Sequence, residues 1–68
     1  RDSVARVDVY DVSGRLVRRL WDGPVASGER TIEWDGRDSH GRAVAGGVYY
    51  CRAISGSRSD VRKMVVMR

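Results

Sequence analysis

Apolar and polar side chains alternate along most of the chain, and no segment shows the three- to four-residue spacing of an amphipathic helix. Near the N-terminus, Val7 and Val9 alternate with polar neighbours, which predicts a first strand with one face in water. The clearest alternation runs over 29–34, where Ile32 and Trp34 are expected to face the interior. This two-residue period favours β-strands throughout.

A second strand, predicted over 15–21, is less regular. One face would carry Leu16, Arg18 and Leu20, and the other Val17, Arg19 and Trp21. Because both faces mix apolar and charged side chains, we expect a β-bulge or an edge position, where arginines discourage pairing with another chain. The run Asp22-Gly23-Pro24 is predicted to end this strand, since proline donates no hydrogen bond to a sheet.

Two more strands are predicted over 48–54 and 60–67, joined by a hairpin at Ser55-Gly56-Ser57. The first of them carries apolar side chains on both faces, which indicates a central strand. Together, the alternations predict ten core residues: Val7, Val9, Leu16, Leu20, Ile32, Trp34, Tyr49, Cys51, Met64 and Val66.

Glycine and aspartate mark the connections between strands. An aspartate can accept hydrogen bonds from the backbone two residues on, and a glycine can adopt positive φ, so 11–14 is predicted to be a tight turn. The stretch 35–47 has no strand pattern and is predicted to be an ordered crossover loop. The residues expected to shape these connections are Asp11, Gly14, Asp35, Gly36, Asp38, Gly41 and Gly46.

Five short strands without a helix predict an all-β, Greek-key sandwich. A chain of 68 residues forms one small domain of marginal stability, so we take residues 1–68 as a single domain. The chain begins with Arg1 rather than methionine and enters a strand almost at once. We therefore expect it to be a piece of a longer protein.

Composition excludes several functions. Thirteen basic and nine acidic residues give a net charge of +4, but the two signs are interleaved, whereas nucleic-acid binding usually needs a basic stripe. No apolar stretch is long enough for a membrane span. The single cysteine, Cys51, has no partner for a disulfide or a zinc site and is expected to be a buried, inert thiol.

No residue pattern indicates an enzyme, a cofactor or a metal site. Asp35 and Asp38 lack the alternating oxygen ligands and closing glutamate of a calcium loop, so they are interpreted as turn caps. His40, the only histidine, has only the adjacent Ser39 as a partner for catalysis and is expected to lie in an exposed turn.

Two groups of side chains could serve recognition. Trp34, Tyr49 and Tyr50 could form a sugar-binding platform, although the phase of the third strand favours core packing for Trp34. A basic cluster is either a solvated edge or a docking patch for an acidic partner or a glycan. The candidate partner surface is Arg15, Arg18, Arg19 and Trp21.

Several runs, in this order and spacing, resemble one family. They are Val9-Tyr10-Asp11-Val12-Ser13-Gly14-Arg15, Trp34-Asp35-Gly36-Arg37-Asp38, Gly41-Arg42, Ala45-Gly46-Gly47-Val48-Tyr49-Tyr50 and Lys63-Met64-Val65-Val66. This pattern is similar to the immunoglobulin-like domain of the flagellar hook-capping protein FlgD and to the C-terminal sorting domains of bacterial proteins exported by the type IX (Por) system.

The resemblance implies an immunoglobulin-like (fibronectin III-like) sandwich of seven strands, of which this chain lacks the first one or two. It also implies a position at the C-terminus of a larger extracellular or cell-surface protein. Sorting domains often end in a short basic tail, for which only Lys63 and Arg68 are available here. An edge left unpaired by the missing strands would favour self-association.

Three hypotheses follow for the function. The first is a non-catalytic accessory module for sorting, anchoring or protein contact, with export machinery or neighbouring domains and subunits as partners. The second is a structural assembly domain of the hook-cap type. The third, a carbohydrate-binding appendage, requires exposed aromatic residues such as Trp21 or Tyr50.

Overall fold

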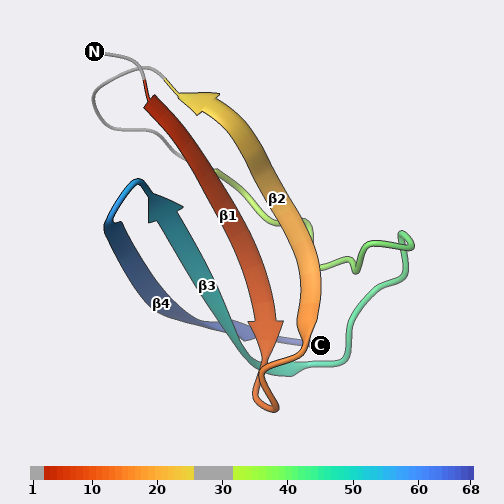
Figure 1. The fold of residues 1–68 in the computed structure, drawn as a ribbon. Coiled ribbons are helices and arrows are strands. Elements are labelled where there is room, and N and C mark those ends of the chain that lie inside the picture. Colours follow the sequence, from red (N-terminus) through yellow and green to blue (C-terminus); the bar gives the residue numbers. More distant parts are fainter. Residues whose placement is uncertain (1–2, 26–31) are drawn as a thin grey trace.

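The computed structural model describes residues 3–25 and 32–68, which contain four strands: β1 (Ser3–Asp11), β2 (Leu16–Val25), β3 (Gly47–Ser55) and β4 (Arg58–Val66). They form one antiparallel sheet in the order β2-β1-β3-β4 (Figure 1). The all-β class is therefore confirmed. In chain order and in spatial order, these strands match strands C, C′, F and G of one sheet of an immunoglobulin-like sandwich.

The core lies on one face of the two central strands. Val9 is completely buried, and Val7 and Tyr49 are nearly so. Val9 lies opposite Cys51 on β3 and Arg18 on β2, so these side chains share the same face of the sheet. Burial of this face removes apolar surface from water and provides the main stabilising contribution of the fold.

The opposite face of β1 is not the wet face that the alternation predicts. Asp8 points to this face and is only 1% exposed, because the arginine side chains of Arg6 and Arg19 close over it. β1 has a neighbour on each side, so long side chains from adjacent strands can cover it. The prediction of a solvated face was therefore wrong at this residue.

β2 contains the predicted irregularity, and it also shows where the face assignment was wrong. The β1–β2 register shifts between Val7 and Asp8 and again between Val9 and Tyr10. Each shift inserts an extra residue in β2, so the side chains no longer simply alternate between faces. As a result, Arg18 lies on the same face of the sheet as Val9, whereas Leu16 pairs with Tyr10 on the other face.

Leu16 is consequently 46% exposed, and its prediction as a core residue was wrong. The remaining predicted core residues are half-buried: Leu20, Ile32, Trp34, Cys51, Met64 and Val66. The predicted end of β2 at the Asp-Gly-Pro run was also wrong, because the strand continues through Pro24, which pairs with Val4. Proline is compatible with an outer strand, where its nitrogen need not donate to a neighbour.

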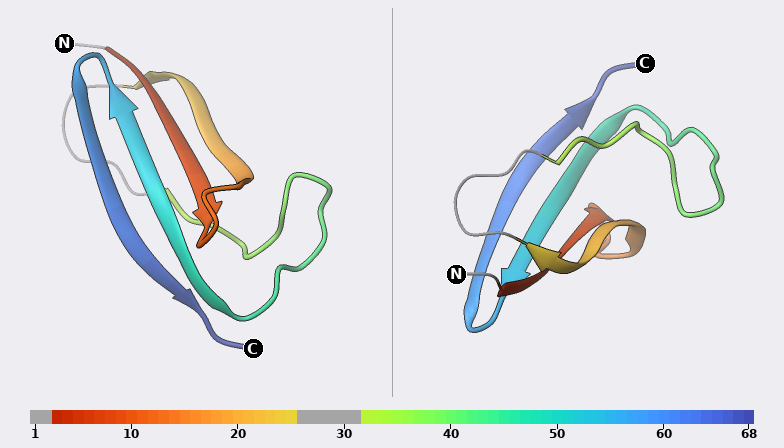
Figure 2. Two further views of the ribbon diagram at one scale, coloured as in Figure 1. Left: turned by 60° about the horizontal axis from the view of Figure 1, so that its bottom comes forward. Right: turned by 90° about the horizontal axis from the view of Figure 1, so that it is seen from above.

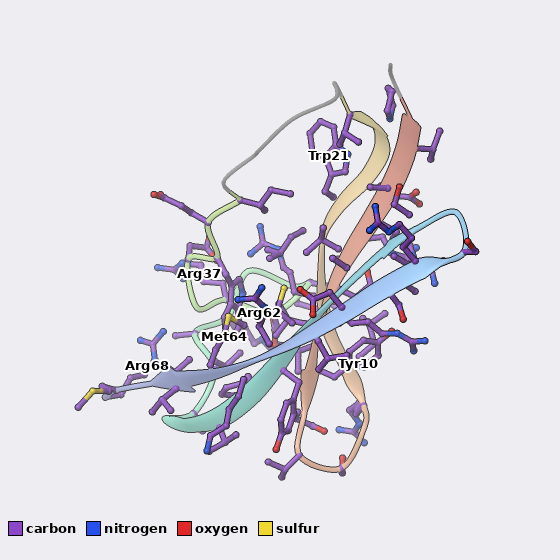
Figure 3. All side chains as sticks on the ribbon, turned by 90° about the vertical axis from the view of Figure 1, so that its left-hand side faces the viewer. Tyr10, Trp21, Arg37, Arg62, Met64 and Arg68 are labelled. Carbon is purple, nitrogen blue, oxygen red and sulfur yellow. The ribbon has the colours of Figure 1, made fainter. Side chains whose placement is uncertain are left out.

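β3 and β4 form the regular hairpin that the sequence predicts. Their register runs without a shift from Gly47 opposite Val66 to Ser55 opposite Arg58, and Gly56 has a φ of 59° in the connecting turn. Tyr49 lies on the core face and Tyr50 on the opposite face. Figure 3 shows the two sides of the sheet, with Tyr10 on one and Met64 and Arg37 on the other.

The segment 32–46 takes the place of a second layer over the core face. Of the strand predicted over 29–34, residues 29–31 lie outside the described residues, and 32–34 are not in a strand. Ile32 and Trp34 are nevertheless half-buried around the exposed Glu33, so the alternation indicated their burial correctly. Figure 2 shows this segment, lime to green, running beside the sheet rather than within it.

Candidate functional site

Two turns of the structure have the same pattern of hydrogen bonds. In the first, the Oδ1 atom of Asp11 accepts hydrogen bonds from the backbone N–H groups of Ser13 at 2.9 Å and Arg15 at 3.0 Å. In the second, the Oδ1 atom of Asp38 accepts from those of His40 at 2.9 Å and Arg42 at 3.0 Å. Both aspartates thus cap a turn that they begin.

The backbone bonds of the two turns match as well. Gly14 donates its N–H to the carbonyl of Asp11, and Gly41 donates to the carbonyl of Asp38, each at 3.0 Å. The glycines have φ of 85° and 79°, a left-handed conformation that side chains with a Cβ rarely adopt. The sequence predicted each turn separately but missed that they are the same turn. The signal was the repeated pattern Asp-x-x-Gly-Arg at 11–15 and 38–42.

A cleft of about 310 Å³ lies between these turns. The first turn contributes Asp11 and Arg15, and the second contributes Asp38 and His40. Its apolar lining consists of Leu16, Val17, Val44 and Tyr49. This combination of an apolar lining and a polar rim suits a protruding side chain of a partner better than a reacting substrate, because the carboxylates already hold the backbone.

The turn hydrogen bonds also favour the charged form of both aspartates. The Ser13 hydroxyl, followed by the Arg15 backbone N–H, lowers the pKa of Asp11 below its usual value. The backbone N–H of Arg42, followed by that of His40, lowers the pKa of Asp38. A carboxyl group whose pKa is lower in the folded state stabilises the protein above its unfolded pKa, and this contribution is lost as the pH falls through the folded value.

We therefore expect the free energy of unfolding to fall as the pH drops below about 4. The double variant Asp11→Asn and Asp38→Asn keeps an acceptor oxygen at each turn but removes the titration. Urea unfolding at several pH values should show that the free energy of unfolding falls less at acid pH in this variant than in the wild-type chain. If the pH dependence were the same in both proteins, the two turn aspartates would not be the cause of the loss of stability at acid pH.

The loop that carries the second turn is fixed to the sheet at several points. On β2, the Arg18 guanidinium contacts Asp35 at 2.9 Å, and the Val17 carbonyl accepts a hydrogen bond from the Ser39 N–H at 3.1 Å. On β3, the Tyr49 ring packs edge-to-face on Trp34, with ring centroids 5.2 Å apart. As predicted for the crossover loop, residues 35–46 contain none of the four strands, although β3 begins at Gly47, the last residue of the predicted stretch.

The Tyr49 hydroxyl adds a further tie, because it donates a hydrogen bond of 2.7 Å to the Ala45 carbonyl. In immunoglobulin-like sandwiches a tyrosine near the start of strand F bonds the backbone a few residues upstream and precedes the strand's cysteine by two residues. Tyr49 is near the start of β3, and Cys51 follows two residues later. This tyrosine corner supports the assignment of β3 as strand F.

The four residues of the candidate partner surface are divided between two faces. Arg18 and Trp21 lie opposite Val9 and Val7 on the core face, and both are half-buried. Arg19 lies on the opposite face, where it binds Asp8. Arg15 is exposed in the first turn beside the cleft. They do not form one patch, and whether any of them contacts a partner stays a prediction.

An ionic cluster around the buried Asp8 connects β1 to β2 on the face opposite the core. The two carboxylate oxygens of Asp8 contact the Nε atoms of Arg19 at 3.0 Å and Arg6 at 3.2 Å. The Tyr10 hydroxyl also donates to Asp8 at 3.3 Å. Sequence reasoning missed this cluster, because a charged residue between two apolar ones is normally interpreted as exposed. Its groups satisfy one another, so the cluster is structural.

The other candidate sites are not assembled. His40 is exposed in its turn, and Tyr50 lies on the opposite face from Trp34 and Tyr49, so the three aromatic residues form no platform. Burial, with a smaller effect from Asp8 and Asp60, raises the pKa of the Cys51 thiol and so disfavours the reactive thiolate. Within residues 3–25 and 32–68, no cluster of three potential ligands could hold a metal ion.

One comparison with known proteins is positive. A protein-family model described as FlgD Ig-like domain matches residues 2–59, which include β1, β2, β3 and the first residues of β4. No curated protein and no solved structure is significantly similar to the chain. In the part of the chain that the structure describes, no helix is long and apolar enough to cross a membrane.

Proposed function

Because the chain belongs to the FlgD Ig-like domain family, we propose that it is a structural, non-catalytic module that acts through contacts with other proteins. The observation that carries this proposal is the fixed crossover loop. Its polar side chains hold the backbone, and its ties to β2 and β3 keep the cleft between the two turns in one shape. A surface fixed in this way can bind a partner with little loss of conformational entropy.

We place an assembly role of the hook-cap type ahead of a role in type IX sorting. The matching family takes its name from the hook-capping protein, whereas no comparison supports the sorting domain. A free basic tail is also not supported, because the Arg68 guanidinium donates a hydrogen bond of 3.0 Å to the Gly36 carbonyl. An extracellular or cell-surface location remains part of the proposal, since assembly of this kind takes place outside the cell.

A domain exchange tests the assembly role. The immunoglobulin-like domain of a hook-capping protein would be replaced by residues 1–68 and expressed in a strain without its own cap. We expect hook growth to be restored at least in part. A matched control carries Val9→Asp, which buries a charge in the core and should abolish the effect. If the hybrid hook-capping protein were stable and exported but supported no hook growth, the proposal would be contradicted.

A reporter experiment tests the sorting alternative separately. Residues 1–68 would be fused to a periplasm-directed reporter in a host with type IX secretion. We expect the reporter to stay in the periplasm. Delivery of the reporter to the cell surface, and its loss in the Val9→Asp variant, would reverse the order of the two functions.

A further inference from the structure

The two outer strands of the sheet differ in how easily they can accept another strand. β2 has two register shifts and contains Gly23 and Pro24, features that hinder strand addition. β4 pairs with β3 at nine consecutive positions without a shift and contains no proline. No described residue pairs with β4 on its other side. The regular edge of β4 is therefore the one suited to strand addition.

The side chains of β4 are mostly exposed. Val61 and Val65 are 55% and 60% exposed and share a face with Lys63. On the other face, Asp60 and Arg62 form a salt bridge of 3.1 Å with each other, although both side chains are largely in solvent. A strand that carries opposite charges two residues apart can pair with a copy of itself so that each charge meets its opposite.

Among antiparallel pairings of β4 with a second copy of β4 that are centred on residues 60 to 63, only the pairing centred on Val61 places opposite charges across from each other. If two copies of β4 pair antiparallel with Val61 opposite Val61, each Asp60 lies opposite the Arg62 of the other copy, and Lys63 lies opposite Ser59. Centring the pair on Asp60, Arg62 or Lys63 instead places like charges directly opposite each other, which is destabilising.

We propose that β4 is a self-pairing edge, through which two copies of this domain join their sheets with Val61 opposite Val61. This inference rests on the proposed function and deepens it by naming a second copy of the domain as one partner. The added strand satisfies the outward backbone groups of β4, and the two cross-strand Asp60–Arg62 pairs select the register.

Disulfide cross-linking tests the register directly. In a Cys51→Ser background, Val61→Cys places two cysteines opposite each other, at a Cα separation that a disulfide spans. The matched control is Val65→Cys, a similarly exposed position that the register places opposite Ser57 of the other copy. Under mild oxidation we expect at least about tenfold more covalent dimer from the first variant than from the second. Equal yields, or no dimer from either variant, would overturn the proposal.

A charge exchange tests the role of the ion pairs. Asp60→Arg places an arginine opposite Arg62 and should lower the rate of Val61→Cys cross-linking about tenfold. Adding Arg62→Asp restores opposite charges and should restore the rate. An unaffected rate in the single variant, or no recovery in the double variant, would contradict the register. Circular dichroism checks that each variant keeps its sheet. The hook-growth test above has its own outcome, so failure of self-pairing and failure of the assembly role can be told apart.

Discussion

Tyr49→Ala is expected to unfold the domain, with a loss of about 3–5 kcal/mol in the free energy of unfolding. Tyr49 is 8% exposed on the core face, its ring packs on Trp34, and its hydroxyl binds the Ala45 carbonyl. The truncation therefore removes the contacts between the crossover loop and β3. A domain this small has about the same total stability, so the folded state should no longer dominate. Urea unfolding followed by circular dichroism measures the change.

Tyr49→Phe separates the ring from the hydroxyl. It keeps the edge-to-face contact with Trp34 and loses only the donor to Ala45, so we expect a loss of about 1 kcal/mol. If the phenylalanine variant were as unstable as the alanine variant, the hydroxyl rather than ring packing would hold the loop. If both variants were as stable as the wild type, the loop would not be fixed by Tyr49.

Val9→Ala is expected to lower the free energy of unfolding by about 2–3 kcal/mol. The Val9 side chain is 0% exposed, and its strand pairs on both sides, so the surrounding backbone cannot easily collapse into the space left by two methyl groups. Denaturant unfolding measures the change. If the free energy of unfolding depends on denaturant concentration with the same slope in the variant and the wild type, stability rather than compactness has changed.

Val65→Ala is the matched control for this prediction. The same two methyl groups are removed from a side chain that is 60% exposed on β4, so the change should be within about 0.5 kcal/mol. Equal losses at Val9 and Val65 would mean that the valines of β1 do not form the core face.

Local signals in the sequence were enough to predict much of the fold. The aspartates and glycines at 11–14 and 35–42 correctly indicated the turns, because their hydrogen bonds and positive φ depend on neighbouring residues only. The two runs predicted as strands over 48–54 and 60–67, with the Ser55-Gly56-Ser57 connection between them, gave the correct hairpin. The mixed faces of β2 correctly indicated a bulge and an edge position.

The errors came from contacts between distant segments. Leu16 is exposed because each register shift depends on how β2 pairs with β1, which alternation within β2 does not reveal. Asp8 is buried because arginines from its own strand and from β2 meet above it. The alternation around Ile32 indicated burial correctly, but a strand also needs a hydrogen-bonded neighbour, which this segment lacks in the described sheet.

The candidate site was predicted in parts but not as an assembly. Asp11 and Asp38 were interpreted correctly as turn residues, yet nothing in the sequence places the two turns on either side of one cleft. The cluster of neighbouring arginines indicated a single surface. Arg18 and Arg19 are consecutive residues of β2 with no register shift between them, so they point to opposite faces: Arg18 binds the crossover loop and Arg19 binds Asp8.

Nuclear Overhauser contacts from Val9 test the strand order, on which the core, the cleft and the free edge of β4 all depend. In a solution of the chain, backbone protons of Val9 should show cross-strand contacts with both Cys51 and Arg18, because β1 lies between β3 and β2. Contacts with only one of these strands, or a β3 neighbour other than β1 and β4, would contradict the account.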